Sequence, residues 1–152
     1  MINFKINYLL PKATSLLFAF LFSYVGVSKF FDHYYFESVL NNSTLISWAS
    51  TFLSLAIPIS ELALAILLIS PYREIGLLLS CILLSIFTFY VAYMILFIPQ
   101  LPCSCGGILN KLSWRNHLIL NILLTFLGLF AWRFEKRNNR IIAITRVSRT
   151  PV

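Results

Sequence analysis

The chain has 152 residues and a mass of 17.5 kDa, with 59% hydrophobic residues, only 11% charged residues and a mean hydropathy of +0.85. A soluble domain usually carries about a quarter charged residues, so the composition excludes an ordinary soluble protein. Fourteen Phe exclude a disordered chain, and five Gly and six Pro exclude a collagen-like one.

The net charge of +7 is unevenly distributed, because six of the twelve Lys and Arg residues lie between Arg133 and Arg149. A terminal cluster of cations beside apolar segments is typical of a membrane-topology signal rather than of a nucleic-acid-binding face. We therefore expect membrane lipid, and no nucleic acid, among the partners of this protein.

Apolar segments of about 20 residues can cross the hydrocarbon core of a bilayer. The sequence contains four, at 13–31, 51–70, 75–98 and 117–134. Lys5 and Lys12 precede the first segment as in a secretory signal, but its apolar core is too long and no small-residue cleavage site follows, so it is expected to stay as an anchor.

The distribution of cations predicts the orientation of these segments. With four spans, both termini lie on one side together with the turn at 71–74, and that side collects nine Lys and Arg residues. The opposite side collects three, which are Lys29, Lys111 and Arg115. This excess predicts cytoplasmic termini and outward loops at 32–50 and 99–116, in a multi-pass protein of the cell inner membrane whose loops face the periplasm in a Gram-negative cell.

Antiparallel segments joined by a short turn predict an all-α integral membrane protein, an up-down-up-down four-helix transmembrane bundle. We divide the chain into a cytoplasmic amino-terminal segment, 1–12, a membrane domain, 13–134, and a basic cytoplasmic tail, 135–152. The residues after Asn138 are polar and basic, which is typical of a tail that lies on the membrane surface or is disordered.

The three cysteines divide into two kinds. Cys81 lies inside the third span, and the 22 residues between it and Cys103 correspond to about 33 Å along a helix. A disulfide requires Cα atoms within about 7 Å, so Cys81 is expected to be a small buried apolar residue.

Cys103 and Cys105 stand two residues apart in a Cys-Ser-Cys-Gly-Gly run in the second outward loop. A disulfide between them can close only with strain, and a strained, exposed disulfide is more oxidising than a structural one. Disulfide chemistry persists outside the cytoplasm, and Lys111 and Arg115 supply positive charge that would stabilise a thiolate. This pattern favours a redox pair.

Two other interpretations of this loop stay open. The disulfide can be purely structural, or Cys103 and Cys105 can bind a metal ion together with His117, although no fourth ligand is evident. His117 itself can act as a base that activates a cysteine thiol, or it can simply cap the start of the fourth span.

Several segments, taken in order, resemble the MauE/DoxX-like membrane proteins over about residues 15–132. They are Tyr-Val-Gly-Val-Ser-Lys-Phe-Phe-Asp at 24–32, Phe-Glu-Ser-Val-Leu at 36–40, Pro-Ile-Ser-Glu at 58–61, and Pro-Cys-Ser-Cys-Gly-Gly at 102–107 leading into His117 and Asn121. The last is similar to the methylamine utilisation protein MauE branch. The resemblance implies a four-helix membrane protein associated with periplasmic redox chemistry. It also implies the role of the MauE branch, which is to help form or transport the disulfide-rich small subunit of methylamine dehydrogenase.

Glu61 stands about 15 Å deep in the second span, where an acidic group is costly without a partner. Lys29 lies only two residues from the outer end of its span and is expected to reach outward, so a direct ion pair with Glu61 is not expected. The hydroxyls of Tyr24 and Tyr90, with those of Thr88 and Thr125, match the depth of Glu61 better.

These groups predict a small polar pocket in the outer half of the bundle. Pro58 contributes to it, since a proline inside a helix frees the carbonyl of Ser54. The pocket can be a quinone-headgroup site or a proton relay that uses Glu61, Tyr24 and Tyr90. Alternatively, Glu61 only binds a neighbouring helix and holds the bundle together.

The sequence leads to a main functional hypothesis and two alternatives. The main one is a membrane thiol-disulfide oxidoreductase or redox partner, in which Cys103, Cys105 and His117 exchange a disulfide with a periplasmic thioredoxin-like or cysteine-containing protein. The first alternative is a non-enzymatic assembly factor or accessory subunit. The second is a metal-delivery protein that uses the same loop.

Overall fold

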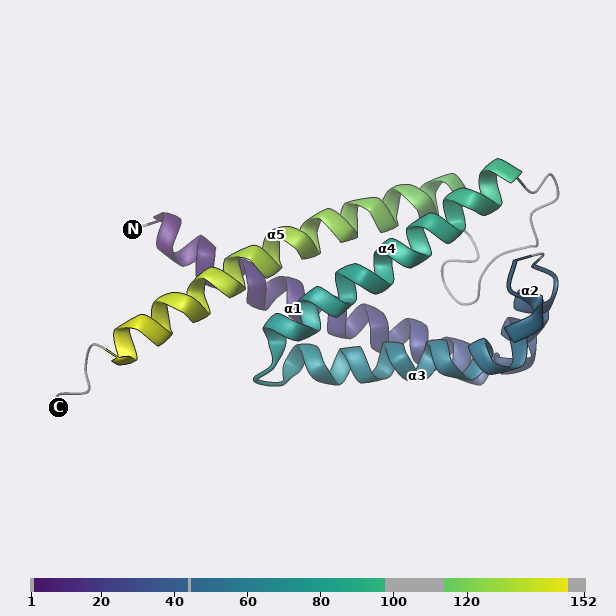
Figure 1. Ribbon diagram of the computed structural model, residues 1–152, viewed down its shortest axis with the longest axis horizontal. Coiled ribbons are helices and arrows are strands. Elements are labelled where there is room, and N and C mark those ends of the chain that lie inside the picture. The colour runs from purple at the N-terminus through teal and green to yellow at the C-terminus, as the bar shows by residue number, and fades with distance from the viewer. Residues whose placement is uncertain (1, 44, 98–113, 148–152) are drawn as a thin grey trace.

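The structure is a computed structural model that describes residues 2–43, 45–97 and 114–147, without the side chains of residues 2–7, 143, 146 and 147. Every regular element in these ranges is a helix (Figure 1). In chain order they are α1 (Ile2–Phe31), α2 (His33–Asn41), the short 3-10 helix η1 (Ser47–Ala49), α3 (Ser50–Ile69), α4 (Arg73–Phe97) and α5 (Trp114–Val147).

Four of these helices are long and apolar enough to cross a membrane, over Tyr8–Phe31, Ser47–Ile69, Arg73–Phe97 and Trp114–Ile142. Consecutive long helices run antiparallel, with the most extensive packing between α1 and α3 and between α4 and α5 (Figure 1). This arrangement confirms the expected multi-pass helical membrane protein.

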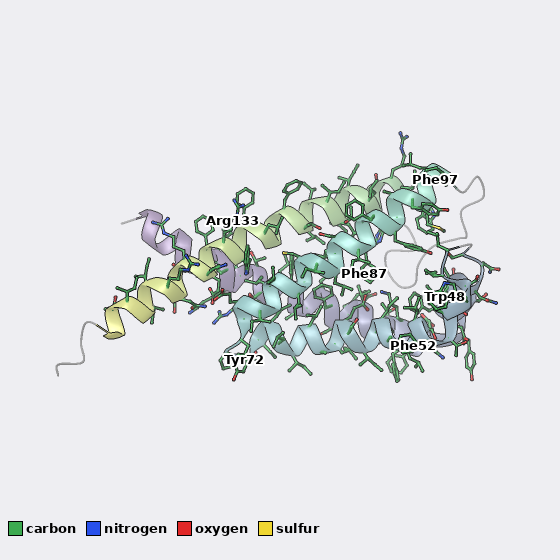
Figure 2. The ribbon with its side chains drawn as sticks, in the orientation of Figure 1. Trp48, Phe52, Tyr72, Phe87, Phe97 and Arg133 are labelled. Atoms are coloured by element: carbon green, nitrogen blue, oxygen red, sulfur yellow. The ribbon has the colours of Figure 1, made fainter. Side chains whose placement is uncertain are left out.

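The two ends of the bundle differ. At one end, which we call the cap end, α2 follows α1 and packs on α3, and α4 ends and α5 begins at this same end of the bundle (Figure 1). Trp48 and Phe97 lie at this end in Figure 2, and Tyr72 lies at the other. The opposite end, which we call the turn end, carries the turn at 70–72 and both chain termini (Figure 1).

The interior of the bundle is filled by aromatic and aliphatic side chains from all four long helices, including Phe18, Phe22, Leu68, Leu77 and Leu124. Large apolar side chains also cover the outer surface: Phe20, Phe89 and Leu96 are 74%, 77% and 75% exposed. A helix that is apolar on every side suits a bundle surrounded by lipid, because the lipid replaces water as the solvent of its outer face.

The structure differs from the sequence expectations in three segments. The first helix already begins at Ile2, well before residue 13. The stretch 32–50 is not a plain loop but contains α2, which is fastened to the start of α3 by a 2.7 Å hydrogen bond from Thr51 Oγ1 to Glu37 Oε1. Of the two alternatives for the tail after Asn138, the disordered one is wrong for residues 139–147, because α5 continues to Val147.

Candidate functional site

The polar centre of the bundle is an ion pair between α1 and α3. Lys29 Nζ lies 2.5 Å from Glu61 Oε1, and the side chains are 12% and 1% exposed. The expectation that Lys29 would reach outward, without pairing to Glu61, was therefore wrong. In an apolar interior the attraction between an acid and a base offsets their desolvation cost best when they are in direct, hydrogen-bonded contact, as Lys29 and Glu61 are here.

The packing of α1 against α3 explains why the depth count failed. A Cβ atom on Gly26 would lie 3.2 Å from the Pro58 carbonyl oxygen and 3.3 Å from Glu61 Cβ, so the two helices approach closely at this level. Lys29 is then only about one turn from Glu61 along the axis. Helical side chains tilt toward their own N-terminus, so in antiparallel helices these two tilt toward each other.

This geometry also explains the spacing of the two segments that carry the family resemblance. Gly26 permits the close approach, and Lys29 follows it by three residues on α1. Pro58 and Glu61 have the same spacing on α3. The matched spacing that indicates the ion pair was therefore present in the sequence. Deriving the pair from it required the register of the two antiparallel helices and the direction of the side chains, and not only the depth of each residue.

Side chains from three neighbouring helices surround the Lys29 ammonium. It lies 5.2 Å from the ring centroid of Phe36 on α2 and 5.0 Å from that of Phe87 on α4. Phe87 projects from the middle part of α4 (Figure 2). Together with Glu61 on α3, these two rings bring side chains of α2, α3 and α4 to the Lys29 side chain of α1. Aromatic faces attract a cation most strongly where water is scarce.

The second carboxylate oxygen of Glu61, Oε2, is buried and has no hydrogen-bond partner among the described residues. The hydroxyls of Thr88 and Thr125 do not reach it, because they donate to Leu84 and Asn121 of their own helices at 2.7 Å. Tyr24 is 39% exposed, and neither it nor Tyr90 bonds to Oε2. Lys29 supplies the partner that the packing interpretation of Glu61 requires.

The start of α5 brings two further polar residues to the cap end. His117 is half-buried and Asn121, one turn later, is 6% exposed, so both lie on the inward face as their spacing of four predicts. His117 follows the first residue of α5, Trp114, by three positions.

Cys103 and Cys105 lie outside the described residues. The described chain stops at Phe97 and resumes at Trp114, and both of these flanking residues lie at the cap end (Figure 1). The sequence therefore connects the two cysteines to the end of the bundle that carries His117 and the Lys29–Glu61 pair.

Cys81 is buried in the core at 3% exposure and forms no disulfide, which confirms the expected packing role. Its Sγ would lie 2.7 Å from a Cβ atom on Gly128, and Phe18 Cε2 would lie 2.9 Å from the same atom. The thiol thus fills the space that the missing side chain leaves where α1, α4 and α5 meet.

Comparison with known proteins gives one family. No curated protein matches the chain, and no solved structure matches it. The model of the family described as methylamine utilisation protein MauE matches residues 7–134, which include the whole of α3 and α4, most of α1, the first part of α5 and the segment with the two cysteines. With four candidate spans and a match over most of its length, the chain belongs to the MauE family of membrane proteins.

Proposed function

We propose that this MauE-family protein exchanges a disulfide with an exported partner through Cys103 and Cys105. The observation that carries the proposal is the position of both thiols between Phe97 and Trp114, the flanking residues at the cap end. Two cysteines separated by one residue in a membrane protein otherwise poor in cysteine suit a reactive pair better than a structural crosslink.

The exchange balances without a further reactant. A thiolate of the partner attacks one sulfur of the Cys103–Cys105 disulfide, and a mixed disulfide forms as the intramolecular bond breaks. The second partner thiolate attacks the mixed disulfide and releases the second cysteine. The partner becomes a disulfide, the pair becomes a dithiol, and the two protons lost by the partner end on Cys103 and Cys105. His117 is the group we propose to carry a proton during this transfer.

The orientation required by this chemistry follows from the charge distribution. Nine Lys and Arg residues on the turn-end side against three on the cap-end side support cytoplasmic termini and a cap end outside the inner membrane. Outside the cytoplasm, a disulfide between Cys103 and Cys105 would persist. The partner we propose is a thioredoxin-like or cysteine-containing periplasmic protein.

The deciding experiment is the redox state of the pair in intact cells. In a Cys81→Ala background, a membrane-impermeant thiol reagent should label Cys103 and Cys105 only after reduction, and a Ser104→Ala control should behave identically. Replacement of either cysteine by Ser should abolish exchange with the partner. Two thiols that stay free, or labelling only after the membrane is opened, would refute the proposal.

Genetic complementation separates this function from the two alternatives. A chain with both Cys103→Ser and Cys105→Ser that restores the function of a deletion strain would identify an assembly factor or accessory subunit, whose bundle acts without the cysteines. Stoichiometric copper or zinc binding that is lost with Cys105→Ser would instead identify metal delivery.

A further inference from the structure

Three arginines form a continuous stripe on the part of α5 nearest the turn end. Arg133, Arg137 and Arg140 are all exposed, and at 100° per residue they lie within about 60° of one another around the helix. We call them the arginine stripe. None of the three makes an ion pair or hydrogen bond with a described residue, whereas the neighbouring Lys136 covers the Trp132 ring at 4.8 Å.

The acidic residues at this end are directed away from the arginine stripe. Glu135 binds Arg73, with 3.5 Å between Oε1 and Nε, and Glu74 accepts a 2.9 Å hydrogen bond from Asn139 Nδ2. Glu135 and Asn139 lie on nearly the opposite side of α5 from the stripe. Both contacts attach that side to the start of α4, so the stripe stays uniformly positive.

The position of the stripe along α5 matches the level of lipid headgroups. Trp114 and Arg133 are separated by 19 residues, or about 29 Å of helix, which is close to the thickness of a hydrocarbon core. Arg133 therefore reaches the far interface when Trp114 stands at the near one. The next seven residues carry Arg137 and Arg140 through about 10 Å of the headgroup layer.

We propose that the arginine stripe binds the phosphate of an anionic phospholipid in the leaflet at the turn end. Each guanidinium offers a planar fork of N–H donors that matches two phosphate oxygens, and this pairing is stronger than a contact made by charge alone. The proposal needs only the turn end at a membrane surface, and it is independent of the cysteine chemistry.

The test measures lipid preference next to the stripe. Trp132 precedes Arg133 by one residue, and in a Trp48→Phe, Trp114→Phe background it is the single fluorescent tryptophan. The purified protein is reconstituted in phosphatidylcholine bilayers that contain phosphatidylglycerol, and one of the two lipids carries bromine near its headgroup as a quencher. Comparing the quenching by brominated phosphatidylglycerol with that by brominated phosphatidylcholine gives the relative occupancy of the site by the two lipids.

We expect phosphatidylglycerol to be preferred over phosphatidylcholine at least about fivefold. This ratio is what the attraction of a single cation to an anionic lipid surface would give. Replacing the three arginines by Gln should bring the preference near one, and replacing them by Lys should leave it intermediate. A charge-matched control with Lys5→Gln, Lys12→Gln and Arg146→Gln, which are off the stripe, should keep most of it. Far-UV circular dichroism, and unchanged quenching in bilayers made of brominated phosphatidylcholine alone, verify that each variant is folded.

Two results would overturn the proposal. The first is no preference for phosphatidylglycerol in the parent protein. The second is an equal loss of preference in the stripe variant and in the charge-matched control, which would assign the attraction to net charge rather than to a site. A Lys variant that equals the parent would exclude the guanidinium fork in particular.

Discussion

The Lys29–Glu61 pair gives the sharpest test of how this bundle is held together. We consider Lys29→Met, Glu61→Leu and the double variant, which remove one charge, the other, or both. Breaking a buried ion pair costs about 3 to 5 kcal/mol because a charge is left without a partner, whereas replacing both members by apolar groups is often close to neutral.

The two single variants should not be equal. Lys29→Met leaves Glu61, which is 1% exposed and has no other hydrogen-bond partner among the described residues, so we expect a loss of about 4 kcal/mol. Glu61→Leu leaves Lys29, which is 12% exposed and keeps its two aromatic neighbours. Because Lys29 can also reach toward the cap end, we expect a loss of only about 2 kcal/mol of stability. The double variant should lose about 1 kcal/mol.

The measurement is equilibrium unfolding in mixed micelles, where a mild detergent is titrated with dodecyl sulfate and helix loss is followed by circular dichroism. Lys12→Met is a suitable control, because Lys12 contacts only Tyr8 on its own helix among the described residues and should change stability by less than about 0.5 kcal/mol. A double variant that is less stable than either single variant would refute the reasoning.

Two further predictions concern close packing between helices. Gly128→Ala should lower the free energy of unfolding by about 1 to 3 kcal/mol, because its new Cβ meets Cys81 Sγ at 2.7 Å. Adding Cys81→Ala should recover part of this loss. If the effects of the two substitutions are simply additive, this contact does not cause the loss. Gly26→Ala should cost about 1 to 2 kcal/mol, because the nearby carbonyl of Pro58 is backbone and cannot rotate away; an unchanged unfolding midpoint in the same micelle titration would exclude this contact.

The sequence was sufficient for the properties that depend on composition and local periodicity. All four apolar segments were found, because length and hydropathy alone decide whether a helix can cross a bilayer. The bounds of the second and third agree with α3 and α4 within about two residues, whereas α1 begins well before residue 13 and α5 continues well past residue 134. The packing role of Cys81 also followed from distance along one helix. The family resemblance over residues 15–132 was confirmed by the match over residues 7–134.

The polar centre could not be derived in the same way. Each residue's depth was counted from the end of its own segment, and this assumed that the outer ends of α1 and α3 lie at one level. The stretch between them contains α2 and η1, and α3 extends past the end of α1, so Lys29 and Glu61 come together despite their different counts.

The amino-acid sequence by itself determined that this chain is a helical membrane protein of the MauE family with four candidate spans, because those properties belong to single segments and their order. Only the tertiary structure decided which charges meet. Contact between Lys29 and Glu61 depends on the register of two antiparallel helices and on a close approach at Gly26. The isolation of the arginine stripe depends in turn on Glu135 and Asn139 being held by α4.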